Sequence, residues 1–283
     1  MLCTNFEQLQ KASREGYAIP AINTQGGNYD IIMAICKAAE ELKSPVILAH
    51  YVSTGAYSGN DWFVQVAKWC AGKVSVPVSI HLDHGDGFPI CMEALKLGFT
   101  SLMIDGSTKP IEENAALTQS VVKVAKCFGV PVEAEIGELQ RLDNGVVQEN
   151  KNVADPDQVR EFLSLCQPDT LAIGIGNAHG YYHGKPDIKL EVLEAVRKFT
   201  SIPLVLHGCT GMDEQIIRDA VKLGVAKINF GTEIRYKYVE HYEEALRTMD
   251  HQGHSWKLSQ FASGALAEDV KRIILLSGSA GKA

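Results

Sequence analysis

The chain has 283 residues, 46% of them hydrophobic, and a formal net charge of −7. This length suits one large α/β domain or two small ones, and the hydrophobic fraction is too high for a disordered chain. The sequence has no basic run or basic-aromatic stripe, which argues against a nucleic-acid binder. An anionic sugar phosphate stays compatible with the net charge, because backbone amides and a bound metal can outweigh it locally.

The seven cysteines form no CxxC pair and indicate buried, reduced thiols. No apolar run reaches the roughly 18 residues of a membrane-spanning helix. The first residues, MLCTNFEQLQKASREG, lack the apolar block of a signal peptide. We therefore expect a cytoplasmic protein without a membrane partner.

Short apolar runs alternate with longer amphipathic stretches along the chain. The runs predicted as strands are Tyr17–Asn23, Pro45–His50, Val76–Leu82, Thr100–Ile104, Val130–Glu135, Thr170–Ile175, Pro203–His207 and Ala226–Phe230. The stretches predicted as helices include Tyr29–Leu42, Ile111–Phe128, Asp157–Cys166, Leu190–Phe199, Asp213–Leu223, Thr232–Arg247 and Trp256–Leu276. Glycines at 98, 129 and 224 are typical of left-handed helix ends before the next strand.

Eight strand–helix alternations in roughly 250 residues imply a parallel sheet. A closed (β/α)8 TIM barrel fits this count better than an open sheet, and no GxGxxG motif follows the first strand to favour a dinucleotide-binding fold. The sequence therefore predicts one domain over residues 1–283, with the last two helices as additions to the barrel.

The carboxyl ends of the strands form the catalytic face of such a barrel, so polar residues there are candidates for function. His84, His179 and His207 end the third, sixth and seventh strands, and each is followed by glycine. Any one alone is compatible with a hydrogen-bonded strand-end histidine, but three converging imidazoles form a zinc site with an open fourth position. Glu135 is a further candidate ligand or a group that supports one. Asn23, at the end of the first strand, is a candidate for substrate binding.

Two other residues of the barrel interior have more than one interpretation. Glu133 shares a strand face with Glu135 and either joins the site or forms a buried pair with a lysine such as Lys227. His81 is predicted to belong to a polar layer inside the barrel rather than to the metal site.

The loops after the seventh and eighth strands are predicted to hold a phosphate group. They read Gly208–Gly211 and Asn229–Thr232, and each leads into a helix whose N-terminus favours an anion. Thr210 and Thr232 add hydroxyl groups. The alternative for the second loop is ordinary N-capping, with Thr232 as the cap.

Six ordered segments resemble the class II (zinc-dependent) fructose-bisphosphate and tagatose-bisphosphate aldolases over nearly the whole chain. These segments are His81–Gly85, Gly98–Thr118, Val132–Gly137, Ile175–Tyr182, Pro203–Gly211 and Gly224–Glu233. The resemblance implies zinc binding by His84, His179 and His207, catalysis by Asp83, and a carboxylate at Glu135 that approaches the metal. The positions that it implies for the dihydroxyacetone phosphate moiety are Gly180, Gly208, Thr210, Asn229, Gly231 and Thr232.

The resemblance also implies cleavage of a phosphorylated ketose into dihydroxyacetone phosphate and an aldehyde, a homodimer or homotetramer, and a monovalent cation (Na⁺ or K⁺) near the phosphate. Several positions depart from the family's pattern, among them Thr210, which stands where a serine is frequent. The segment Glu138–Gly145 lacks the usual glycine pair, and Asp143 falls where the family has a proton-shuttling glutamate. Cys209 and Tyr51 replace smaller residues, so the substrate is less certain than the chemistry.

Three alternatives remain at this point. A Schiff-base aldolase would need a lysine nucleophile, for which the resemblance offers no position. A metal hydrolase on the same barrel would need a His-x-His pair on the first strand, which holds no histidine. A non-catalytic or partner subunit of an aldolase complex is the third, and the presence of Asp83 with all three histidines argues against it.

Overall fold

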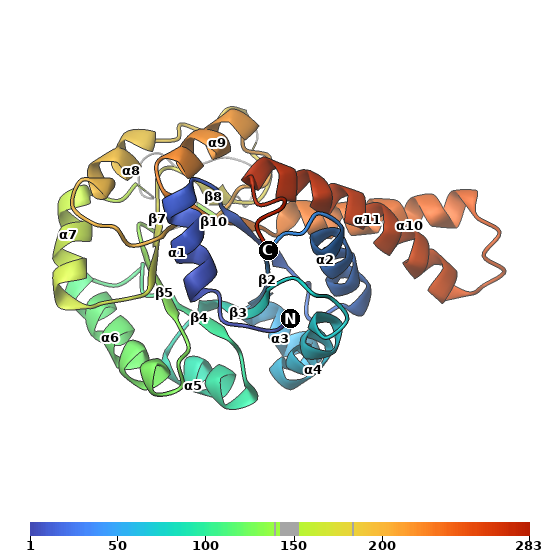
Figure 1. Cartoon of the computed structure of the whole chain (residues 1–283), viewed down its shortest axis with the longest axis horizontal. Coiled ribbons are helices and arrows are strands. Elements are labelled where there is room, and N and C mark those ends of the chain that lie inside the picture. Colours follow the sequence, from blue (N-terminus) through green and yellow to red (C-terminus); the bar gives the residue numbers. More distant parts are fainter. Residues whose placement is uncertain (139, 142–152, 183) are drawn as a thin grey trace.

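A closed barrel of parallel strands forms the centre of the protein in the computed structural model, which describes residues 1–138, 140–141, 153–182 and 184–283 (Figure 1). Its strands are β1 (Ile19–Asn23), β2 (Val46–Tyr51), β3 (Val78–Gly85), β4 (Ser101–Ile104), β5 (Val132–Ile136), β7 (Thr170–Ile173), β9 (Leu204–Leu206) and β10 (Val225–Phe230). The barrel closes where β1 pairs with both β2 and β10. The predicted TIM-barrel fold is confirmed.

Helices surround the barrel and join successive strands. They are α2 (Tyr29–Glu41), α3 (Val52–Ser58), α4 (Asn60–Ala71), α5 (Phe88–Leu97), α6 (Ile111–Cys127), α7 (Pro156–Leu165), α8 (Leu190–Arg197) and α9 (Glu214–Lys222). The Asn28 side chain starts α2 by accepting hydrogen bonds from the Asp30 and Ile31 amides. Among the described residues, no helix combines the length and apolar composition that crossing a bilayer requires.

The amino-terminal helix α1 (Phe6–Glu15) closes the barrel at the end where the strands begin. Leu9 and Ala12 on its buried face pack with Ile19, Ile47 and Ala226 in an apolar cluster separate from the main core. This end is buried, whereas the opposite mouth of the barrel, at the carboxyl ends of the strands, is open for a binding site.

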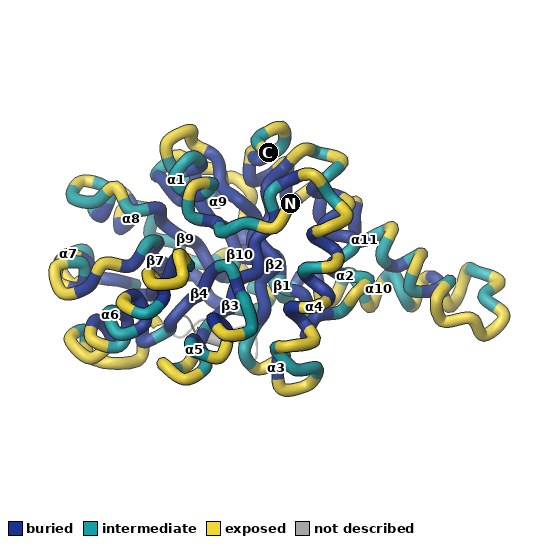
Figure 2. The backbone as a smooth tube through the Cα atoms, turned by 60° about the horizontal axis from the view of Figure 1, so that its bottom comes forward, coloured by how far each residue is buried: buried dark blue, intermediate teal, exposed yellow. Residues whose placement is uncertain are grey.

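Two long helices extend the fold beyond the barrel. Helices α10 (Thr232–Thr248) and α11 (Ser255–Ser277) form a hairpin whose far end projects from the barrel (Figure 1). The returning part of α11 packs against α2, whereas the projecting end is largely exposed (Figure 2). Val239, Leu246 and Trp256 on the hairpin are each about half exposed.

A second, two-stranded sheet lies outside the barrel and was not predicted. It pairs β6 (Gln140–Arg141) in parallel with β8 (Ala178–His179). The pairing places the segment after β5 beside the one that carries His179. Sequence periodicity gives no signal for strands of two residues each.

Candidate metal and substrate site

Three histidine rings meet at the open mouth of the barrel. His84 comes from β3, His179 from β8, and His207 follows β9 directly. One ring nitrogen from each lies within 4.8 Å of the others. The ring centroid of His84 is 5.0 Å from that of His179 and 4.8 Å from that of His207. The structure thus brings together the three histidines that the sequence singled out.

The backbone of β3 explains how two neighbouring residues both face the mouth. His84 has a left-handed φ of 54°, and the pairing of β3 with β4 shifts register between Leu82 and Gly85. A regular strand would direct Asp83 and His84 to opposite faces. Here they line two adjoining cavities instead. A left-handed non-glycine residue costs about 1–3 kcal/mol and is concentrated at functional sites.

A hydrogen bond to Asp105 orients the His84 ring. Its Nδ1–H donates to Asp105 Oδ2 at 2.8 Å, and Ser107 donates its amide and hydroxyl to Asp105 Oδ1. His84 Nε2 is buried and has no hydrogen-bond partner among the described residues. Burial alone would lower the pKa of His84, but the hydrogen bond to Asp105 and the charges of Asp83 and Glu135 raise it to about 9. This unpartnered nitrogen in a negatively charged environment fits a divalent cation.

Asp105, which directly follows the predicted strand Thr100–Ile104, is therefore a site residue that the sequence did not single out. Together with His84 and Glu135 it forms a second group able to hold a metal ion. Glu135 is buried, its Oε2 lies 3.9 Å from His84 Nδ1, and burial raises the pKa of its carboxyl to about 8. The two groups offer imidazole nitrogens and carboxylate oxygens, which are ligands that zinc binds in proteins.

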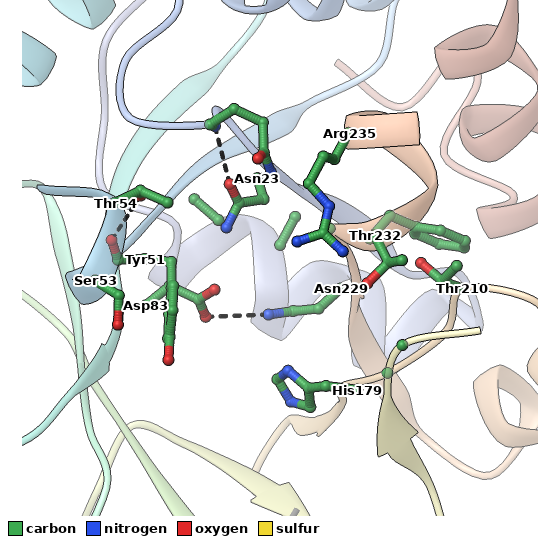
Figure 3. A pocket seen from close by; sticks show the side chains of 17 residues that line it. Asn23, Tyr51, Ser53, Thr54, Asp83, His179, Thr210, Asn229, Thr232 and Arg235 are labelled. Carbon is green, nitrogen blue, oxygen red and sulfur yellow. Dashed lines mark hydrogen bonds between the residues drawn. The ribbon is translucent and has the colours of Figure 1, made fainter. Parts of the chain in front are cut away.

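A cavity of about 470 Å³ lies beside the histidines (Figure 3). The site residues expected from the sequence that line it are Asn23, Asp83, His179, Gly180, Gly208, Thr210, Asn229, Gly231 and Thr232. Asp83 is buried in its wall, and its Oδ1 accepts a hydrogen bond of 3.2 Å from Asn229 Nδ2. Asp143 lies outside the described residues.

One side of the cavity is built for an anion. Helix α10 begins at Thr232 and directs its N-terminus at the cavity, where the backbone amides favour negative charge. The N-cap residue of α10 is Gly231, which has no side chain that could cap the helix. The alternative in which Thr232 is the N-cap is therefore wrong. Instead, the Thr210 hydroxyl accepts a hydrogen bond of 3.2 Å from the Glu233 amide and so connects the loop after β9 with the start of α10.

The Tyr182 hydroxyl connects the remaining loops of the site. It accepts a hydrogen bond from the Ala178 amide at 2.9 Å and donates to the Gly208 carbonyl at 2.8 Å. It therefore ties the segment that carries His179 to the loop after β9. The sequence offered no separate signal for this role, because nothing distinguishes Tyr182 from Tyr181 in the pair of tyrosines that follows His179.

Arg235 also lines the cavity and was not predicted as a site residue. Its guanidinium reaches from the first turns of α10 into the space between Asn23 and Thr232 (Figure 3). Residues three apart on a helix lie on the same side, so the spacing from Thr232 was the signal that could have identified it. Arg235 adds a positive charge on the anion-binding side.

Replacing Gly208 with alanine should destabilise the loop by more than its backbone angle alone predicts. Gly208 has a left-handed φ of 65°, and a Cβ there would collide with the Ala178 carbonyl oxygen. Gly129 has a φ of 66°, but a Cβ added to it would meet nothing within 4 Å, so Gly129→Ala is the matched control. We expect Gly129→Ala to cost about 1–2 kcal/mol, and Gly208→Ala clearly more, in urea unfolding. Equal costs would contradict the steric argument.

Comparison with known proteins places this geometry in a family. The chain matches the family described as "Fructose-bisphosphate aldolase class-II" over residues 4–282. It is 40% identical to a probable fructose-bisphosphate aldolase of Bacillus subtilis over 250 residues, which cover 87% of this chain and 86% of that protein. It is 35% identical to the D-tagatose-1,6-bisphosphate aldolase subunit GatY of Klebsiella oxytoca, with 99% of each chain covered.

A solved structure agrees in both fold and extent. The crystal structure of the YdjI aldolase from Escherichia coli K12 superposes with a TM-score of 0.88 at 35% identity, with 100% of both chains covered. The family match spans nearly the whole chain, and the relatives are aligned over nearly their full lengths. The chain therefore belongs to the class II fructose-bisphosphate aldolase family.

Proposed function

We propose that this protein is a zinc-dependent aldolase. It reversibly cleaves a ketose 1,6-bisphosphate or ketose 1-phosphate into dihydroxyacetone phosphate and an aldehyde such as glyceraldehyde 3-phosphate. The observation that carries this proposal is the meeting of three histidine rings beside a cavity that Asp83 and His179 line and whose other side is a helix N-terminus. The names of the relatives, which include fructose- and tagatose-bisphosphate aldolases, support the substrate class.

We assign the metal to His84, His179 and His207, with Glu135 as an additional ligand. Zinc at this position supplies Lewis-acid polarisation of the substrate ketone. Asp105 holds His84 by its Nδ1–H, which leaves Nε2 for the cation.

Asp83 is proposed as the catalytic base that takes the proton from the C4 hydroxyl as the C3–C4 bond breaks. Its carboxylate is fixed in the cavity wall by Asn229, so it does not have to be reoriented when substrate binds. The carbon that becomes C3 of the product must then receive a proton. We assign this step to Asp143, in the segment of the chain that follows β5.

The substrate phosphate is proposed to bind at the start of α10. Gly180, Gly208 and Gly231 leave backbone groups accessible there, and Thr232 contributes its hydroxyl. Asn23 and Thr210 complete the cavity wall. A monovalent cation, Na⁺ or K⁺, near this phosphate is part of the same proposal.

Arg235→Ala should weaken substrate binding without loss of the metal. A hydrogen bond to a charged group contributes about 1.5–3 kcal/mol, so we expect KM for the phosphorylated ketose to rise by about 10-fold or more. Arg247→Ala, an exposed change near the other end of α10, is the control and should leave KM unchanged. Steady-state kinetics test this, and equal KM values for the two variants would remove Arg235 from the substrate site.

The Schiff-base alternative has no support from the described lysines of the barrel interior. Lys227 is fully buried, and its Nζ lies 2.8 Å from Glu133 Oε2. Lys227 is not among the residues that line the cavity, so it is not placed to attack a substrate carbonyl there. A non-catalytic subunit is the remaining alternative. A zinc-loaded sample assayed for dihydroxyacetone phosphate release over a panel of ketose phosphates distinguishes it, because a non-catalytic subunit would release none.

The assembly and location are proposed on separate grounds. We propose that the whole chain is a single domain and forms a homodimer or homotetramer, in which the exposed apolar residues Val239, Leu246 and Trp256 of the hairpin contact another copy. Five of its seven free cysteines are buried as reduced thiols, which supports a cytoplasmic location.

A further inference from the structure

A layer of buried polar side chains crosses the barrel beneath the proposed metal site. Lys227, Glu133 and His81 are at most 1% exposed. Lys227 Nζ lies 2.8 Å and 3.0 Å from the two carboxylate oxygens of Glu133, and 3.3 Å from His81 Nε2. The sequence left open whether Glu133 joins the site or pairs with Lys227, and the structure shows that it pairs with Lys227 and also contacts His207.

The hydrogen bonds of this layer have one consistent set of directions. Lys227 has only donors, so His81 Nε2 accepts and His81 Nδ1–H donates to Ser101 Oγ at 2.8 Å. Asn5 Nδ2 donates to the same Ser101 oxygen at 2.9 Å. The layer thus runs from Asn5, just before α1, to the ion pair of Glu133 with Lys227.

The layer ends at His207, where Glu133 contacts Nε2 of the imidazole ring and not Nδ1. Glu133 Oε1 lies 2.9 Å from His207 Nε2 and, as a carboxylate, can only accept there. On the other side of the ring, Asn229 Nδ2 lies 3.3 Å from His207 Nδ1 and donates to it. Both neighbours require the same tautomer, with the proton on Nε2 and the lone pair of Nδ1 on the cavity side.

We propose that Glu133, held in place by Lys227, is a positioning residue that fixes His207 as the Nε2–H tautomer and so presents Nδ1 to the metal ion. This inference rests on the proposed zinc function. A carboxylate behind a ligating imidazole also raises the basicity of the ligand. Lys227 offsets the cost of burying that carboxylate, which would be severe for an unpaired charge.

A purely structural role for the same ion pair predicts something different. Buried ion pairs often add little net stability, because the desolvation of both charges cancels their attraction. If the pair only filled the barrel interior, a neutral pair of similar size would leave zinc affinity and the His207 tautomer unchanged. If it positions His207, both should change even in a variant that folds normally.

The test uses the double variant Glu133→Leu with Lys227→Met, which removes both charges and the hydrogen-bond acceptor of Glu133 together and leaves no unpaired ion. Zinc affinity is measured by competition with a chromophoric chelator, and we expect it to fall by about 10–100-fold. The control is Ser44→Ala, which removes a buried hydroxyl contact of 2.7 Å to Ser279. The control should bind zinc as the unaltered chain does. Zinc affinity within twofold of the unaltered chain for a folded double variant would overturn the inference.

A second measurement reads the His207 tautomer directly in the metal-free chain with Glu133 and Lys227 unaltered. Long-range ¹⁵N–¹H spectra of metal-free, ¹⁵N-histidine-labelled protein report the tautomer of each ring, and His207 is assigned by its loss in His207→Gln. We expect the Nε2–H tautomer. An Nδ1–H tautomer in a chain that binds zinc would overturn this inference alone, whereas a chain that takes up no zinc would overturn the proposed function and this inference with it.

Discussion

Replacement of Asp83 by asparagine is expected to lower kcat by about 10²–10⁴-fold, the usual contribution of a positioned general base. Asparagine keeps the size of the side chain and an oxygen that can accept the Asn229 hydrogen bond, but it cannot take the proton of the C4 hydroxyl. Because Asp83 is not among the grouped metal-binding residues, zinc content should stay at the level of the unaltered protein. A coupled assay for dihydroxyacetone phosphate measures the rate, and elemental analysis measures the metal.

Asp250→Asn is the matched control for this experiment. Asp250 is an exposed aspartate next to the turn of the α10–α11 hairpin, so the same chemical change there should leave kcat unaltered. Near-normal cleavage by the Asp83 variant would remove Asp83 from the role of base. A loss of zinc in that variant would show that its effect acts through the metal site instead.

Removal of the metal by a chelator should abolish cleavage and lower stability at the same time. A ligand that binds only the folded state stabilises it by RT ln(1 + [L]/Kd), about 4 kcal/mol when free zinc is about 1,000 times Kd. We therefore expect a lower urea midpoint after chelation, and recovery of both activity and midpoint when zinc is returned. His84→Ala should abolish the response of activity and midpoint to zinc.

Two controls separate this outcome from the alternatives. His254→Ala changes an exposed histidine at the start of α11 and should leave the response to zinc intact. Borohydride with substrate should fail to trap a covalent adduct, because no Schiff base forms. Activity that survives chelation, together with such an adduct, would contradict the metal mechanism.

The barrel could be predicted from the sequence because its signals are local and repeated. Each strand is a short apolar run buried on both sides, and several of the helices end at a glycine that adopts the left-handed conformation, as Gly98, Gly129 and Gly224 do. The predicted strand ends differ from the observed ones by at most a few residues, since periodicity fixes an element better than its boundary. His84 and His207 could be found for the same reason, because they lie at or just after the ends of β3 and β9, whereas His179 lies on β8, beyond the end of β7.

The parts of the site that sequence reasoning missed depend on geometry between distant segments. The left-handed backbone of His84 breaks the strand alternation that otherwise decides which side chain faces the mouth. Asp105 acts through a hydrogen bond between neighbouring strands, and Arg235 reaches the cavity from a helix outside the barrel. The pairing of Glu133 with Lys227 was one of two alternatives that the sequence left open, because no local pattern shows which residues of β5 and β10 face each other across the barrel.

The Tyr182 hydroxyl couples the segment that carries His179 to the loop after β9, so that neither can move without affecting the other. The residue before His179 and the glycine of the anion-binding loop share this one group, so displacement of either segment strains the other. Thermodynamic linkage then applies in both directions. If a metal ion bound by the three histidines raises the affinity for inorganic phosphate, bound phosphate raises the affinity for the metal ion by the same factor. Tyr182→Phe would remove this coupling between metal binding and phosphate binding while leaving both binding sites in place.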